Sequence, residues 1–171
     1  MYDYERAILK TFSQIDGVSE NLNSAVYKKA VCSFGDLRPA EKVADEVLQK
    51  VIKGAVLIEL KEAVIKSVKR LKPYYSYLLS VHFGILDVEK PNELNKDRNY
   101  YRSLAYAVGK FSKEMEKEGY EKQTYETVCT YFPFIDYAYK RAVSFNMKIA
   151  TSSSYKADRS FKPNQSSKTK I

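Results

Sequence analysis

Apolar residues recur along most of this chain at the three- and four-residue intervals that place them on one face of a helix. The segment 97–118 shows this pattern most clearly. Its apolar residues step by three, four, three and four positions: Tyr101, Leu104, Val108, Phe111 and Met115. The same kind of spacing predicts further helices over about 3–15, 19–34, 39–71, 73–84, 121–131 and 134–149. We therefore expect an all-α fold, a multi-helix bundle with almost no strand.

Glycine and proline predict where several of these helices begin and end. Gly17 should stop the first helix and Gly119 the 97–118 helix, because glycine adopts the left-handed conformation found after helix C-termini. Ser19 then suits the N-cap of the second helix. Gly35 should end that helix, and Pro39 suits the first turn of the next.

The helix expected over 39–71 is long, and its pattern suggests an interruption. Its apolar face is formed by Val43, Val47 and Val51 and then by Leu57, Leu60, Val64, Val68 and Leu71. Gly54 lies between the two sets and weakens a helix by roughly 1 kcal/mol relative to Ala, which predicts a break or bend. We accordingly divide the chain into an N-terminal helical region, 1–54, and a second region, 55–150.

Charge and composition change after Ala150. The whole chain has a formal net charge of +8, and half of that excess lies in residues 151–171, which carry five basic groups and one acidic group. The same residues are rich in Ser, Lys and Asn, a composition typical of disorder. We expect a disordered basic tail at 151–171, and a folded part that is only mildly basic.

Few residues along the chain suggest catalysis. The single histidine, His82, stands in an apolar stretch, and Cys32 and Cys129 lie far apart without partners at metal-ligand spacing. With no catalytic triad or phosphate-binding loop either, we expect no enzyme activity, no cofactor and no metal. The longest apolar runs are too short to span a membrane, and the charged start has no signal-peptide pattern. These features predict a cytoplasmic protein.

The 97–118 segment carries a second stripe, opposite its apolar one. Its residues Arg102, Tyr106, Lys110, Lys113 and Lys117 step by four, four, three and four positions, and Arg98 lies one turn earlier. A helix that enters the major groove of DNA needs one apolar face docked on a scaffold and one face of basic and small polar side chains. The predicted DNA-binding residues are Arg98, Asn99, Arg102, Ser103, Tyr106, Lys110 and Lys113. The alternative is a solvated surface helix, since several glutamates neutralise its last turns.

Residues 57–115 resemble the C-terminal promoter-binding domain of bacterial sigma factors and sigma-like phage or plasmid regulators. The resemblance lies in the turn Leu71-Lys72-Pro73, in the stretch Tyr77-Leu78-Leu79 of the helix that follows, and in Arg98-Asn99-Tyr100-Tyr101-Arg102 followed by Lys110-Phe111. It implies a helix-turn-helix with 97–118 as recognition helix and about 87–94 as its first helix, although Pro91 interrupts that segment. It also implies transcription regulation in bacteria, with RNA polymerase or another protein as partner. The absence of Trp argues against a complete sigma factor.

Two alternatives to duplex DNA binding remain open. The helix over 41–71 offers a docking surface for another protein or for a second copy of the chain. The fifteen tyrosines, interleaved with basic residues, could instead stack on the bases of RNA or single-stranded DNA. The same tyrosines also suit semi-buried packing with their hydroxyls at the surface.

Overall fold

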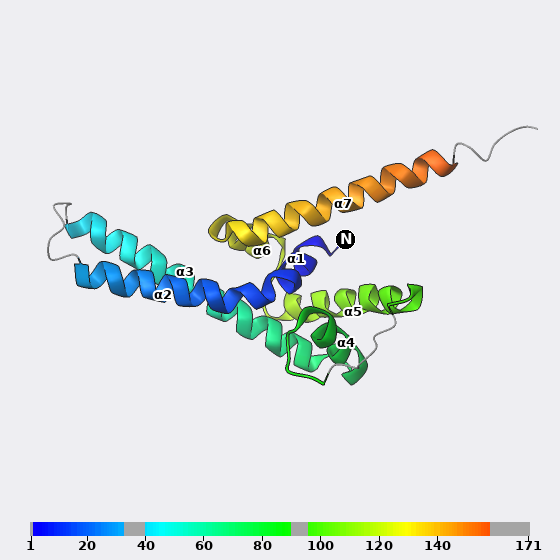
Figure 1. Ribbon diagram of the computed structural model, residues 1–171, viewed down its shortest axis with the longest axis horizontal. Coiled ribbons are helices and arrows are strands. Elements are labelled where there is room, and N and C mark those ends of the chain that lie inside the picture. Colours follow the sequence, from blue (N-terminus) through cyan, green and yellow to red (C-terminus); the bar gives the residue numbers. More distant parts are fainter. Residues whose placement is uncertain (1, 33–39, 90–95, 158–171) are drawn as a thin grey trace, which may run out of the picture.

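A computed structural model describes residues 2–32, 40–89 and 96–157, and every regular element in those ranges is a helix (Figure 1). This confirms the expected all-α fold. The elements in chain order are α1 (Asp3–Thr11), the 3-10 turn η1 (Phe12–Gln14), α2 (Ile15–Cys32), α3 (Ala40–Arg70), α4 (Pro73–Phe83), α5 (Arg98–Lys117), α6 (Lys122–Tyr131) and α7 (Pro133–Ala157). None of these helices is both long enough and apolar enough to cross a bilayer.

The core forms where α1 and the C-terminal half of α3 meet α4, α5 and the α6–α7 corner. The predicted apolar stripe of α5 is its buried face, from Leu104 to Met115, and Phe111 at its centre is fully buried. Tyr101 is the exception, because it lies one turn before the packed region and is half exposed. From α3 the core receives Leu57, Leu60, Val64 and Val68.

Helices α2 and α3 form a long antiparallel hairpin that projects from the core (Figure 1). The predicted break at Gly54 is wrong, since α3 is continuous from Ala40 to Arg70. Gly54 is buried, and a Cβ added there would lie 3.9 Å from the side-chain oxygen of Asn23 on α2. Packing against α2 thus holds the glycine in the helix, and the expected 54/55 boundary falls inside one element. Val51, expected on the buried face, is half exposed.

Glycine marks helix ends at two of the predicted places. Gly84 after α4 and Gly119 after α5 have φ values of 70° and 85°. Gly17 does not end a helix, and Ser19 is not an N-cap, because η1 turns the chain without a break and α2 starts at Ile15. Gly35 and Pro39 lie outside the described residues.

The last helix is longer than expected. Helix α7 starts at Pro133 and continues to Ala157, so residues 151–157, predicted to be disordered, are helical. No Gly or Pro occurs between Phe134 and Ala157, so no residue of the helix-breaking types stops it. Residues 158–171 of the predicted tail lie outside the described part of the chain.

Helix α1 packs on both α7 and α5. The ring of Tyr4 stacks on Tyr139 of α7 at a centroid distance of 4.0 Å and on Tyr125 of α6 at 5.4 Å. On the neighbouring face, the hydroxyl of Ser112 on α5 donates a 2.7 Å hydrogen bond to the carboxylate of Glu5. One short helix therefore connects three elements that come much later in the sequence.

Candidate nucleic-acid interface

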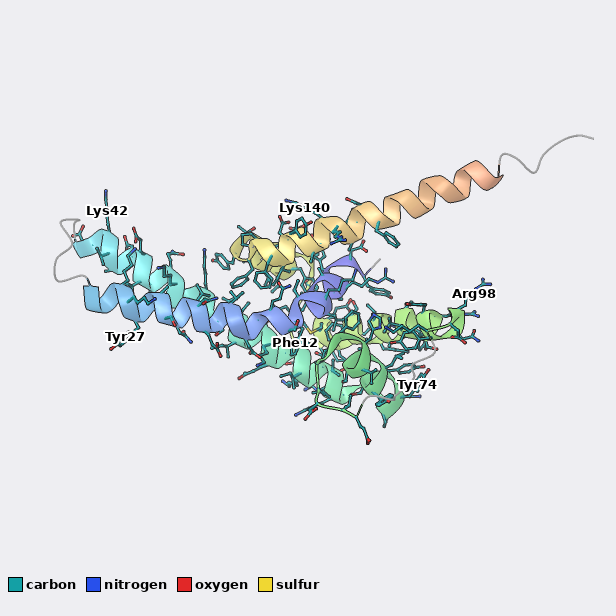
Figure 2. All side chains as sticks on the ribbon, viewed as in Figure 1. Phe12, Tyr27, Lys42, Tyr74, Arg98 and Lys140 are labelled. Atoms are coloured by element: carbon teal, nitrogen blue, oxygen red, sulfur yellow. The ribbon has the colours of Figure 1, made fainter. Side chains whose placement is uncertain are left out.

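Helix α5 has an apolar face that is buried and a basic, polar face that reaches the surface. While the apolar face is packed in the core, Arg98, Asn99, Arg102, Tyr106 and Lys113 are exposed. Ser103 and Lys110 are half-buried. Between Arg98 and Lys113 the helix carries four basic side chains and no acidic one. All seven residues predicted to bind DNA thus reach the surface of one helix. Figure 2 shows Arg98 at the N-terminal end of α5, pointing away from the body of the protein.

A hydrogen-bonded corner holds the start of α5 in place. The side chain of Asp97 caps the helix by accepting a 2.7 Å hydrogen bond from the backbone N–H of Tyr100. The Tyr100 hydroxyl lies 2.8 Å from Nδ1 of His82 on α4. Burial, together with the positive charges of Lys96 and Lys10, lowers the pKa of His82, so this imidazole is neutral at pH 7. His82 therefore packs against the start of α5 with one ring nitrogen hydrogen-bonded to Tyr100.

The middle of α5 lines a groove that the sequence did not predict. The junction of α3 and α4 contributes Arg70, Lys72 and Tyr75 to a cavity of about 310 Å³ beside α5. The rings of Tyr75 and Tyr106 lie 5.4 Å apart, and the ammonium of Lys110 lies 5.1 Å from the centroid of the Tyr106 ring. The cation–π contact holds Lys110 along the groove without neutralising its charge.

Positive charge dominates this groove. Its lining contains five basic side chains and one carboxylate, Glu114, which pairs with Lys117 at 2.6 Å. Arg70 and Lys66 both pair with Glu118, and the hydrogen bond from Lys66 is the main reason that the pKa of this carboxyl is lowered. In the described part of the chain, Lys72, Lys110 and Lys113 form no ion pair. The groove therefore continues the basic stripe of α5 onto α3 and α4.

The helix expected before the recognition helix is not present where the structure describes the chain. Residues 87–89 are not helical, and residues 90–95 of the expected 87–94 helix lie outside the described residues. The Tyr77 hydroxyl donates a 3.4 Å hydrogen bond to the Glu89 carbonyl, which holds this segment along α4. Among the described residues, helices α3, α4 and α1 provide the packing surface for α5.

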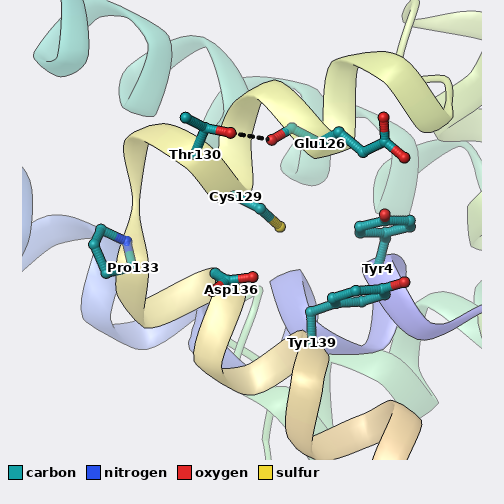
Figure 3. A pocket seen from close by; sticks show the side chains of 7 residues that line it. All are labelled: Tyr4, Glu126, Cys129, Thr130, Pro133, Asp136 and Tyr139. Atoms are coloured by element: carbon teal, nitrogen blue, oxygen red, sulfur yellow. Dashed lines mark hydrogen bonds between the residues drawn. The ribbon is translucent and has the colours of Figure 1, made fainter.

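A second cavity, between α1, α6 and α7, has a different character (Figure 3). It measures about 420 Å³, and the thiol of Cys129 points into it, near Asp136 and Tyr4. Burial, and next the charge of Asp136, raises the pKa of this thiol to about 11, so it is protonated at neutral pH. Asp136 itself pairs with Lys140 at 2.6 Å. The cavity thus offers a half-buried, unactivated thiol.

No cluster of metal-ligating side chains occurs among the described residues. The sequence matches no family model, and no curated protein or solved structure is significantly similar to it. The resemblance of residues 57–115 to sigma-factor domains therefore depends on the quoted sequence features alone.

Proposed function

We propose that this chain binds duplex DNA through the exposed basic face of α5. The observation that carries the proposal is the unbroken stripe Arg98, Arg102, Tyr106, Lys110 and Lys113, on a helix whose opposite face is fixed in the core. A rigid helix with this division of faces suits the major groove, which is wide enough to admit one helix.

The two halves of the stripe suit different contacts. The N-terminal end of α5 carries Arg98, Asn99, Arg102 and Ser103. Arginine and asparagine can form paired hydrogen bonds with the edges of guanine and adenine. Tyr106, Lys110 and Lys113 lie further along, beside the groove that contains Lys72, and suit phosphate oxygens. The groove can hold the DNA backbone while the end of the helix reads the bases.

From the resemblance of residues 57–115 we also infer a role as a sigma-like regulator of transcription in the bacterial cytoplasm, with RNA polymerase or another protein as partner. The proposed DNA contact does not require the first helix of a helix-turn-helix. In this chain, the hydrogen bond between His82 and Tyr100 and the packing of α5 on α3 perform the supporting role of that helix.

The test is retardation of a labelled duplex over a range of salt concentrations. The wild-type chain should bind at low salt, with an affinity that falls steeply as salt rises, because counterions are released from the phosphates. The double variant Lys110→Ala, Lys113→Ala should reduce the salt dependence by about one unit of slope per lost phosphate contact.

Lys42→Ala is the matched control, because this exposed lysine lies at the tip of the α2–α3 hairpin, far from α5 (Figure 2). If the wild type retards no duplex at low salt, or if Lys42→Ala weakens binding as much as the α5 variant, the proposal is wrong. Preferential binding to single strands would favour stacking by the tyrosines instead.

Self-association through α3 is the second candidate, and a separate observation favours it. Leu48, Val51 and Ile58 are 56%, 50% and 47% exposed, and Ala55 between them is exposed as well. These positions step by three, four and three, an order that reads the same in both directions. A second copy of α3 running antiparallel would therefore meet the same stripe, as a two-fold interface requires.

Sedimentation equilibrium tests this candidate directly. A dimer that Leu48→Asp converts to a monomer would support it, with Tyr27→Asp on the outer side of α2 as control for an added charge at an exposed apolar residue. A monomeric wild type at all accessible concentrations would rule it out.

A further inference from the structure

An acidic, tyrosine-lined cavity lies between α1, α5 and α6, away from the basic groove. It measures about 620 Å³, and four tyrosines and three glutamates contribute to its lining. The glutamates are Glu5, Glu116 and Glu121, and the one basic side chain at the cavity, Lys122, is 80% exposed. On a chain of net charge +8 this is a local concentration of negative charge.

Glu5 is the buried member of the three glutamates. It is 8% exposed, and one of its oxygens accepts the 2.7 Å hydrogen bond from Ser112. No Lys or Arg forms an ion pair with it in the described part of the chain. A buried carboxylate without a cation is costly, because one hydrogen bond replaces little of its hydration. A cation that enters the cavity would therefore meet a buried carboxylate that has one side-chain hydrogen-bond donor.

Tyr125 supplies a second, independent observation. Its side chain is 4% exposed, and its buried hydroxyl has no hydrogen-bond partner. Tyr125 lines the same cavity as Glu5 and Glu116, and, after burial, the charges of these two glutamates raise the pKa of its phenol. Buried hydroxyls are nearly always paired in native proteins, so this one lacks a partner that a ligand group could supply.

The surrounding rings favour a cation. Tyr4 already stacks on both Tyr125 and Tyr139, so the rings left to meet a ligand are those of Tyr2 and Tyr120, which line the same cavity as the carboxylates. Aromatic faces attract ammonium groups, and the attraction increases where water is excluded.

We propose that this cavity binds an alkylammonium ligand, and that a linear diamine or polyamine is the class that fits it. One ammonium would donate to the carboxylate of Glu5 and to the hydroxyl of Tyr125. A second would lie near Glu116 and Glu121, which are exposed at the mouth of the cavity. A ligand with two ammonium groups can contact all three carboxylates, whereas a ligand with one ammonium beside Glu5 leaves Glu116 and Glu121 without a cation.

Calorimetric titration of the full-length chain with 1,4-diaminobutane tests this proposal. Glu5→Gln removes the charge but keeps an oxygen that can accept the Ser112 hydrogen bond, and it should weaken binding at least about tenfold. Glu116→Gln, at an exposed position, provides the same test if Glu5→Gln does not fold. Glu62→Gln, an exposed glutamate on α3, is the control and should leave the affinity unchanged.

Titration with acetyl-lysine amide in parallel separates two sources of the ammonium group. Tighter binding of the diamine supports the proposal. Tighter binding of acetyl-lysine amide would mean that the cavity binds a lysine side chain of another protein. That result would overturn the proposal that its ligand is a free diamine. The ammonium site itself is overturned if neither compound binds at about 10 mM, or if both bind Glu5→Gln and Glu116→Gln as well as they bind the wild type.

Discussion

Replacing Tyr125 with Phe should make the unliganded protein more stable. The ring is buried between Tyr4 and Tyr120, and its hydroxyl is cut off from solvent without a partner. Burying an unpaired hydroxyl costs about 1–3 kcal/mol, and phenylalanine keeps the ring while it removes that cost. Urea unfolding followed by circular dichroism should show a gain in this range. For a chain of this size, each kcal/mol should raise Tm by about 2–4 °C.

Tyr120→Phe is the matched control. Tyr120 is 7% exposed, but its hydroxyl is not both buried and unpaired, so its removal should bring no gain. Saturating 1,4-diaminobutane should reduce or reverse the advantage of Tyr125→Phe, because only the wild type offers the ligand a hydroxyl. A loss of about 1 kcal/mol or more in the unliganded Tyr125→Phe variant would refute the reasoning, since it would mean that the hydroxyl makes a favourable hydrogen bond.

Three further predictions concern α5 and its surroundings. Arg102→Ala should cost roughly 1–3 kcal/mol at a selected DNA site and relax its sequence preference, whereas Lys113→Ala should weaken all duplexes about equally; competition titrations measure both. Leu104→Ala should lower the free energy of unfolding by roughly 2–5 kcal/mol in urea melts, because Leu104 is 8% exposed and packs in the core. Glu118→Gln should be less stable than the wild type at neutral pH. That deficit should shrink below about pH 4.5, because a carboxyl whose pKa is lowered on folding stabilises above its unfolded pKa and loses this effect as pH falls. A deficit that is constant with pH in urea melts would mean that the ion pairs of Glu118 with Lys66 and Arg70 do not contribute.

The features that the sequence predicts well are local ones. The buried stripe of α5 and the glycines after α4 and α5 are set by residues within a few positions of each other. The prediction at Gly54 is wrong because tertiary packing outweighs helix propensity, a difference of about 1 kcal/mol. At Gly17, where an added Cβ would meet no atom within 4 Å, the chain has already turned at η1 and α2 has begun. At Gly54 the deciding neighbour is Asn23, thirty-one positions away in the chain.

The candidate sites were predictable only where they lie on one helix. The basic stripe of α5 follows from its spacing, but the groove beside it needs Lys72 and Tyr75 from another helix. The run Arg70-Leu71-Lys72-Pro73 was the available signal, since a helix end followed by a proline start leaves its basic side chains at a corner. The acidic cavity joins Glu5 to Ser112, which are 107 positions apart, and no local pattern predicts that contact.

The position of α1 has a consequence for folding during synthesis. Its partners are α5 and α7, so Ile8 and Leu9 have no complete packing surface until the chain has been extended past residue 133. At ribosomal rates of about 5–20 residues per second, that interval lasts on the order of ten seconds. The α2–α3 hairpin needs only neighbouring residues and can form in the meantime. Completion of the core therefore waits for α7, and a nascent chain that stalls before that helix exposes the apolar face of α1 to chaperones and to aggregation.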